Sequence, residues 1–188
     1  VGGATHLDLA PTIPLVLFAL FQLKFAIITP ALITGSFAER VRFSSYLLFI
    51  CLFTLFIYGP VAHWTWHPQG FLRQWGVLDF AGGTVVHMTA GFAALAGALV
   101  LGRRQTHIAS EPTEPANIPF VILGTGMLWF GWFGFNAGSA LAASETAALA
   151  FLTTNTASAA AMLSWIFFDG IRGRKPSALG ACIGAVVG

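Results

Sequence analysis

The sequence predicts an all-α membrane protein, built as a polytopic helical bundle. Hydrophobic residues make up 56% of the 188 positions, charged residues make up only 9%, and the mean hydropathy is +0.79. Soluble domains carry roughly 25% charged residues, so this composition argues against a water-soluble globule. The net charge of +2 and the absence of a basic run also argue against a nucleic-acid-binding protein.

Five complete crossings and part of a sixth follow from the apolar stretches, because a helix needs about 20 apolar residues to span a bilayer. The sequence Ala-Glu-Arg-Val-Arg ends the first crossing, a loop rich in Trp, His and Pro precedes the third, and a polar linker follows it. Because the chain has no initiator Met and stops inside an apolar run, we expect a piece of a longer polypeptide. The crossings are predicted at about 14–37, 44–61, 79–101, 118–141 and 145–168, with the start of another at 177–188.

The basic residues are distributed unevenly between the two sides that these crossings define. Seven fall on one side, whereas only Arg73 falls on the other. The positive-inside rule makes the side with seven cytoplasmic, which places loops 38–43, 102–117 and 169–176 in the cytoplasm. The seven are Arg40, Arg42, Arg103, Arg104, Arg172, Arg174 and Lys175.

Residues 79–87, Asp-Phe-Ala-Gly-Gly-Thr-Val-Val-His, place an acid and an imidazole at the start of the third crossing. Ionisable groups are costly in a bilayer core and therefore mark function by default. On one continuous helix, Asp79 and His87 would lie about 80° apart around the axis and roughly 12 Å apart along it. The alternative interpretation is that Asp79 caps a helix and that His87 is a packing residue.

Several aromatic and hydroxyl side chains are expected in or near the outer half of the bundle. An aromatic face attracts a cation by about 0.5–2 kcal/mol, and a serine hydroxyl can accept a hydrogen bond from an N–H donor. Together they indicate a site for a small cation, although each Phe alone fits lipid contact or packing, and each Trp fits an interface anchor. The set is Phe21, Phe25, Trp64, Trp66, Phe135 and Ser139.

No metal site, cofactor or catalytic centre is expected. The acidic oxygens are too few for a hard metal ion, which takes six or more oxygen ligands. One core histidine with the distant Cys51 and Cys182 makes a poor zinc or haem site. Because the chain also has no Ser/His/Asp set and no paired carboxylates, we expect that it is not an enzyme.

Six segments of the chain resemble the ammonium transporter (Amt/Mep/Rh) family, and the likeness is greater to its bacterial Amt members than to the Rh proteins. The resemblance extends over the whole chain in order, and residues 79–87 and 131–139 are its most specific parts. The other four segments are residues 21–26, 35–40, 147–151 and 175–182.

The resemblance implies a fold of about eleven helices built on an inverted repeat, assembled as a homotrimer with one pore per subunit. This chain would correspond to the third helix through the beginning of the eighth. The resemblance assigns Trp66, Ser139 and Phe21 to an outer substrate site, and Phe25 and Phe135 to a phenyl pair that closes the pore.

The same resemblance assigns His87 as the first of two histidines that line the pore, the second lying on a later helix outside this chain. Asp79 would support the substrate site without touching the substrate. Trp64 remains a substitute for Trp66, because the match needs a one-residue difference in length before Asp79. Lys24 is predicted to turn about 100° away from Phe25 and to reach the outer surface or a subunit boundary.

The implied function is transport of ammonium or ammonia, with methylammonium as an analogue. The cation would bind outside, lose its proton and pass as ammonia through an apolar pore. The implied partners are the lipid bilayer, two further copies of the chain and a cytosolic regulatory protein, and the implied location is the bacterial plasma membrane. The alternative is an ammonium sensor, in which the same bundle signals through an attached cytoplasmic module.

Overall fold

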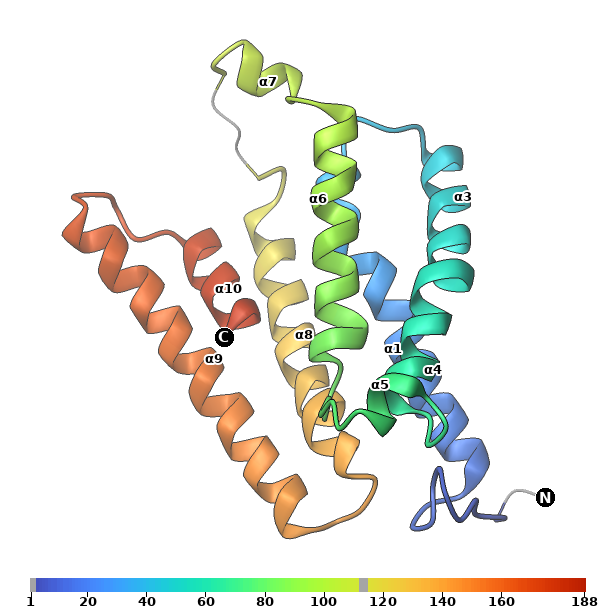
Figure 1. Cartoon of the computed structure of the whole chain (residues 1–188). Coiled ribbons are helices and arrows are strands. Elements are labelled where there is room, and N and C mark those ends of the chain that lie inside the picture. Colours follow the sequence, from blue (N-terminus) through green and yellow to red (C-terminus); the bar gives the residue numbers. More distant parts are fainter. Residues whose placement is uncertain (1–2, 112–114) are drawn as a thin grey trace. The chain divides into compact units, whose positions relative to one another are not determined.

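The computed structural model describes residues 3–111 and 115–188, and every regular element among them is helical (Figure 1). The chain divides into two compact units, Val1–Pro112 and Thr113–Gly188, which are described separately below. Residues 112–114, which belong to the predicted 102–117 loop, lie outside the described residues. The predicted all-α class is confirmed.

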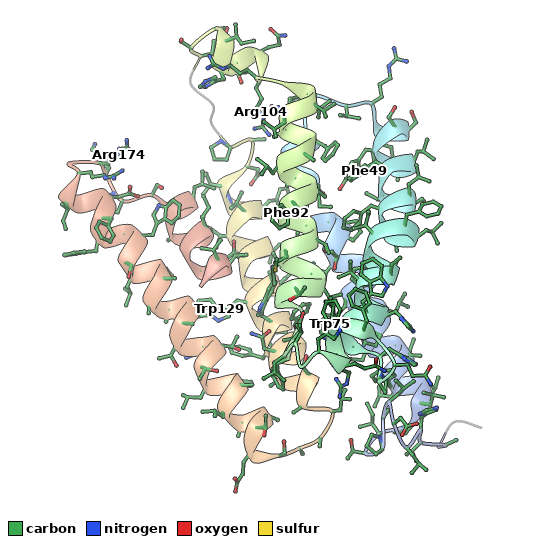
Figure 2. All side chains as sticks on the ribbon, in the orientation of Figure 1. Phe49, Trp75, Phe92, Arg104, Trp129 and Arg174 are labelled. Atoms are coloured by element: carbon green, nitrogen blue, oxygen red, sulfur yellow. The ribbon has the colours of Figure 1, made fainter. Side chains whose placement is uncertain are left out.

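Within the described residues, five helical stretches are long and apolar enough to cross a membrane, and a sixth apolar helix is shorter. Many of their large apolar side chains are exposed in this chain. Phe92, for example, projects from the third stretch and is 66% exposed (Figure 2). The five stretches are Leu15–Phe37, Phe43–Gln74, Gly83–Leu101, Ile118–Ala140 and Glu145–Ile171, and the shorter helix is Ala178–Val187.

The first stretch of unit 1 consists of α1 (Leu15–Leu32) and the short α2 (Thr34–Phe37). Pro14 directly precedes α1, where a proline costs no intrahelical hydrogen bond because the first N–H groups of a helix have no partner. Pro30 lies in the last turn of α1, and the helix ends two residues later. A proline inside a helix clashes with the preceding turn, which accounts for the break between α1 and α2.

The second stretch contains α3 (Phe43–Phe53), the π-helical η1 (Thr54–Tyr58) and α4 (Gly59–Trp66). Pro60 is the second residue of α4, two positions after η1 ends, and it cannot donate an i→i−4 hydrogen bond. The wider π turn absorbs this defect, so the helix continues to Trp66 instead of ending near residue 61. The four-residue α5 (Phe71–Gln74) follows.

The third stretch begins with the π-helical η2 (Gly83–Met88) and continues as α6 (Thr89–Leu101), after which comes the short α7 (Gln105–Ile108). Helical structure therefore starts four residues after Asp79, not at it. Gly82 stands before the helix with φ +102°, a left-handed conformation that breaks the helical path. The separation of about 80° and roughly 12 Å expected between Asp79 and His87 on one continuous helix is wrong for this reason.

Two arginines link α2 to α6 by hydrogen bonds at the end of unit 1 where these two helices meet. Arg40 donates to the carbonyls of Ser36 and Gly102, and Arg104 donates to the carbonyl of Gly35. Carbonyls at helix C-termini lack intrahelical partners, and cations are favourable there. Arg104 and Trp75 lie at opposite ends of this unit (Figure 2).

Unit 2 contains three helices that pack on one another: α8 (Ile118–Ala137), α9 (Glu145–Ile171) and α10 (Ala178–Val187). The 3-10 turn η3 (Gly138–Ala140) extends α8. Each of the three helices starts at a polar residue whose side chain accepts a hydrogen bond from a main-chain N–H of the first turn, as N-caps do. The caps are Asn117, Ser144 and Ser177.

Candidate functional site

Three aromatic rings from two helices form a continuous cluster in unit 1. Phe21 and Phe25 lie four residues apart on α1, and their ring centroids are 4.8 Å apart. Trp66, at the end of α4, contacts Phe25 edge to face, with centroids 5.5 Å apart and planes at 88°. Phe25 is 2% exposed, whereas Phe21 and Trp66 are half-buried. The cluster therefore has a fixed inner ring and two rings that remain accessible.

A hydrogen bond joins this cluster to the turn that precedes η2. The indole Nε1 of Trp66 donates to the main-chain carbonyl of Asp79 at 3.0 Å. This bond fixes both the plane of the indole ring and the position of the turn. Trp64 points elsewhere, because it packs on Phe71 with centroids 5.2 Å apart and is 40% exposed. Of the two candidate tryptophans, only Trp66 contacts Phe25 and Asp79 within the described part of the chain.

The carboxylate of Asp79 caps η2 with all of its acceptor capacity. Its Oδ1 accepts from the main-chain N–H groups of Gly82 and Gly83 at 2.5 and 3.0 Å. Its Oδ2 accepts from those of Thr84 and Val85 at 2.8 and 3.0 Å. The first N–H groups of a helix have no intrahelical partner, and the positive end of the helix dipole favours an anion. The capping interpretation of Asp79 is what the geometry shows.

Gly82 allows the turn to sit directly against the aromatic cluster. A Cβ atom there would lie 2.7 Å from Cγ2 of Val86 and 3.7 Å from Cδ1 of Phe25. The positive φ of this residue is also a conformation that side-chain-bearing residues adopt at a cost. Gly82 was not singled out from the sequence. The Gly-Gly pair that follows Asp79 could have indicated a turn at this position.

His87 lies on the second turn of the same capped helix. Its main-chain N–H donates to the carbonyl of Gly82 at 3.0 Å, in the wide spacing of a π turn. The neighbours Val85 and Val86 are fully buried, while the imidazole side chain is exposed in this chain. Because π turns are frequent at functional sites, the local backbone is consistent with a functional role, and that role stays a prediction.

Lys24 is the residue before Phe25 on α1, so the two side chains leave the helix about 100° apart around its axis. Its side chain is exposed, while that of the next residue is buried. The predicted rotation away from Phe25 therefore agrees with the burial pattern.

Phe135 and Ser139 belong to unit 2, and their pairing with residues of unit 1 stays a prediction. The two residues lie one turn apart at the end of α8 and in η3. The Ser139 hydroxyl donates to the carbonyl of Phe135 at 2.8 Å, which leaves its lone pairs able to accept. The ring of Phe135 stacks on that of Trp132, with centroids 5.0 Å apart and planes at 25°.

A buried polar group in unit 2 was not foreseen from the sequence. Asn136 donates through Nδ2 to the hydroxyl of Thr154 at 2.9 Å, which links α8 to α9. Trp129 and Ser158 lie close to this pair and line the same small cavity. The spacing of Trp129, Trp132 and Asn136, which share one helix face, was the available signal.

Comparisons with known proteins identify a family. Residues 3–188 match the model described as the Ammonium Transporter Family. An ammonium transporter of Aquifex aeolicus is 53% identical over 175 residues, which are 93% of this chain and 40% of that protein. The chain thus spans less than half the length of this curated relative.

Two solved structures share the fold. The crystal structure of a Mep2 mutant from Candida albicans matches with a TM-score of 0.77 and 40% identity, covering 93% of this chain and 41% of that one. A chain described as a sensor Amt protein matches with a TM-score of 0.78 and 30% identity, covering 98% of this chain and 56% of that one.

Proposed function

Because this chain belongs to the ammonium transporter family, we propose that the full protein carries ammonium across the membrane in which it is embedded. The match over residues 3–188 confirms the resemblance and the fold type predicted from the sequence. The chain is part of an integral membrane protein. The substrate is ammonium or ammonia, with methylammonium as an analogue, and no enzymatic step is involved.

The first step of the proposal is recruitment of the cation outside the membrane by Trp66, Phe21 and Ser139. The bond from Trp66 to the carbonyl of Asp79 holds the indole ring in place, so its face is preorganised for a cation. The attraction between a cation and such an aromatic face contributes about 0.5–2 kcal/mol to the free energy of binding. The hydroxyl of Ser139 already donates to Phe135 and can therefore only accept from the bound ammonium.

The second step is passage of the nitrogen past a phenyl gate formed by Phe25 and Phe135. Phe25 is held between Phe21 and Trp66 and is almost completely buried. Phe135 rests on Trp132. The rings exclude water when closed, so opening requires a movement of one ring or both.

The third step is deprotonation and conduction as ammonia beside His87. Burying an isolated ammonium ion in an apolar medium costs on the order of tens of kcal/mol, far more than one aromatic face returns. Ammonia carries no charge and avoids this cost. Asp79 stays outside the path because its carboxylate is fully engaged in capping η2, which fixes the backbone from which His87 projects.

One observation carries this proposal: the aromatic cluster is bonded directly to the turn that starts the helix of His87. The test is uptake of radiolabelled methylammonium by cells that lack their own ammonium transporters and express the full-length protein. His87→Ala should abolish uptake or change its selectivity, whereas His107→Ala, on the short exposed α7, should leave it unchanged. Uptake by the His87 variant equal to the wild type would refute the role of this residue.

The orientation and the assembly complete the proposal. Arg40 and Arg104 lie at one end of unit 1, which supports placing loops 38–43 and 102–117 in the cytoplasm. The same rule places the loop of residues 169–176 there. Bacterial plasma membrane, a homotrimer with one pore per subunit and a cytosolic regulatory partner follow from the family resemblance.

The second candidate function is sensing, and the sensor Amt protein that shares this fold favours it. A sensor would bind ammonium at the same aromatic cluster and pass little of it. Measurements of ammonium binding and ammonium flux on the reconstituted full-length protein distinguish the two functions. Saturable binding without flux indicates a sensor, while flux that rises with the ammonium concentration indicates a transporter.

A further inference from the structure

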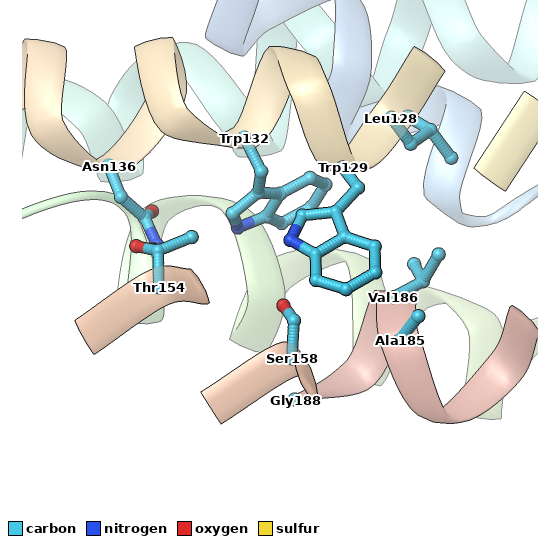
Figure 3. Close-up of a pocket in the computed structure, with 9 residues that line it drawn as sticks. All are labelled: Leu128, Trp129, Trp132, Asn136, Thr154, Ser158, Ala185, Val186 and Gly188. Carbon is cyan, nitrogen blue, oxygen red and sulfur yellow. The ribbon is translucent and has the colours of Figure 1, made fainter. Parts of the chain in front are cut away.

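A small, partly enclosed cavity in unit 2 is lined by polar and apolar side chains of two helices and bordered by the third (Figure 3). Its volume is about 40 Å³. The cavity is lined from α8 by Leu128, Trp129, Trp132 and Asn136, from α9 by Thr154 and Ser158, and at the end of the chain by Ala185, Val186 and Gly188. The helices α8 and α9, which supply its polar groups, are apolar and long enough to cross a membrane, where polar groups without partners are costly.

Trp129 brings a hydrogen-bond donor into this cavity. Its indole Nε1 is completely buried and has no hydrogen-bond partner among the described residues. A buried donor of this kind costs about 1–3 kcal/mol when it stays unsatisfied. Because most buried polar groups in proteins do have partners, this indole requires an acceptor that the neighbouring side chains do not supply.

Ser158 brings a hydroxyl that differs from those of the three threonines just before it on α9. Thr153, Thr154 and Thr156 each donate to a main-chain carbonyl one turn back. Ser158 is 5% exposed and forms no hydrogen bond within the described residues. Figure 3 shows its hydroxyl and the indole nitrogen of Trp129 facing the same space.

The lining selects a neutral occupant. No charged side chain borders the cavity in the described part of the chain. The occupant must accept from the indole of Trp129, which an ammonium ion cannot do because it has no free lone pair. A water molecule needs roughly 10–15 Å³ of such space and two to four polar partners, so the cavity has room for about three.

We propose that this cavity is a site for ordered water that accepts from Trp129 and bonds to Ser158, joining α8 to α9. The water continues the bridge that Asn136 and Thr154 form one turn away. It also supports Trp132, which borders the cavity and stacks on Phe135. This site is separate from substrate binding and does not depend on the transport proposal.

The test follows water at the indole of Trp129 in full-length protein labelled with ¹⁵N at its tryptophans, in lipid nanodiscs. Magnetisation transfer from a long-lived water to this indole proton is expected. The signal is assigned by its loss in Trp129→Phe, while Trp165→Phe, which removes a tryptophan outside the cavity, should leave it in place. Ammonium chloride should not change it, and loss of the water signal on addition would identify the occupant as ammonia and overturn the proposal.

Thermal unfolding provides an independent readout. Ser158→Ala removes one water partner without changing the side-chain volume much, and it should lower the Tm by about 2–4 °C and weaken the transfer to Trp129. Ser164→Ala, at an exposed position of the same helix, should do neither. The proposal is overturned if Ser158→Ala is neutral in both measurements, or if a protein group proves to accept from the Trp129 indole.

Discussion

The indole nitrogen of Trp66 donates a 3.0 Å hydrogen bond to the main-chain carbonyl of Asp79, while the carboxylate of the same Asp79 caps the helix that carries His87. One residue thus connects the end of α4 to the start of η2 through both its main chain and its side chain. A displacement of this turn would therefore move the aromatic cluster and the His87 helix together. The acid serves the site by fixing geometry, with no requirement that it touch the substrate.

Asp79→Asn should destabilise the protein by about 1–3 kcal/mol and lower uptake of methylammonium. An amide keeps one acceptor oxygen in place of two and loses the negative charge that the helix dipole favours. The NH₂ group would face main-chain N–H groups that it cannot accept from. The measurement is thermal unfolding of the full-length protein together with uptake.

Asp8→Asn makes the same chemical change at an exposed position of unit 1 and should leave the Tm and the uptake unchanged. Equal stability of the two variants would contradict the structural role assigned to Asp79.

Gly82→Ala should be more destabilising than Gly76→Ala, although both residues have positive φ, +102° and +87°. The left-handed conformation costs a residue with a side chain roughly 1–2 kcal/mol, and both variants should lose that much. At Gly82 the new methyl group would also meet Val86 at 2.7 Å, whereas nothing lies within 4 Å at Gly76. The difference between the two Tm shifts measures the contact, and identical shifts would show that Val86 moves away without cost.

Much of this architecture could be predicted from the sequence, since apolar length sets the membrane helices. Phe21 and Phe25 are four residues apart, a spacing that puts two side chains on one face of a helix, and their rings do contact each other. The start of the third helix could not be found from hydropathy, because residues 79–82 are themselves largely apolar. The turn depends on main-chain N–H groups that bind the Asp79 carboxylate, and a hydropathy pattern does not record such bonds.

The contacts between helices were also beyond the sequence pattern. Nothing in the spacing of Trp64 and Trp66 shows which of the two faces Phe25, because the π turn of η1 changes the helical phase before them. The cavity next to Trp129 depends on how α10 closes against α8 and α9. Such relationships arise from packing, where side chains far apart in sequence meet.

Trp66→Phe should reduce the affinity for methylammonium, raising the KM of uptake, whereas Trp64→Phe should leave the KM nearly unchanged. Phe at position 66 keeps an aromatic face but loses the bond to Asp79, so the ring is no longer held in one plane. Trp64 contacts Phe71 instead of the cluster. Concentration-dependent uptake by the full-length variants gives both KM values, and a larger effect at Trp64 would reassign the site to that residue.

Arg40→Lys should destabilise unit 1 by about 1–3 kcal/mol, although lysine keeps the positive charge. The guanidinium reaches the carbonyls of Ser36 and Gly102 with two different nitrogens, and so joins the ends of α2 and α6. A single ammonium group cannot reproduce that fork. Arg103→Lys, at an exposed position, should have no effect on the Tm, so a neutral result at both sites would show that Arg40 does not hold the two helices together.

Gly184→Ala should separate α10 from α9 and destabilise unit 2, whereas Gly170→Ala should stabilise it. A Cβ atom at Gly184 would lie 2.8 Å from the Cα of Met162 and 2.9 Å from the carbonyl oxygen of Ala161, both main-chain atoms that cannot rotate away. Small residues allow this close approach, which membrane helices need because no hydrophobic force drives them together in lipid. Gly170 lies in α9 with nothing within 4 Å, so alanine there contributes its helix propensity of about 0.5–1 kcal/mol. Thermal unfolding of the full-length protein should therefore give Tm shifts of opposite sign, and a rise in both variants would mean that α10 can move outward at no cost.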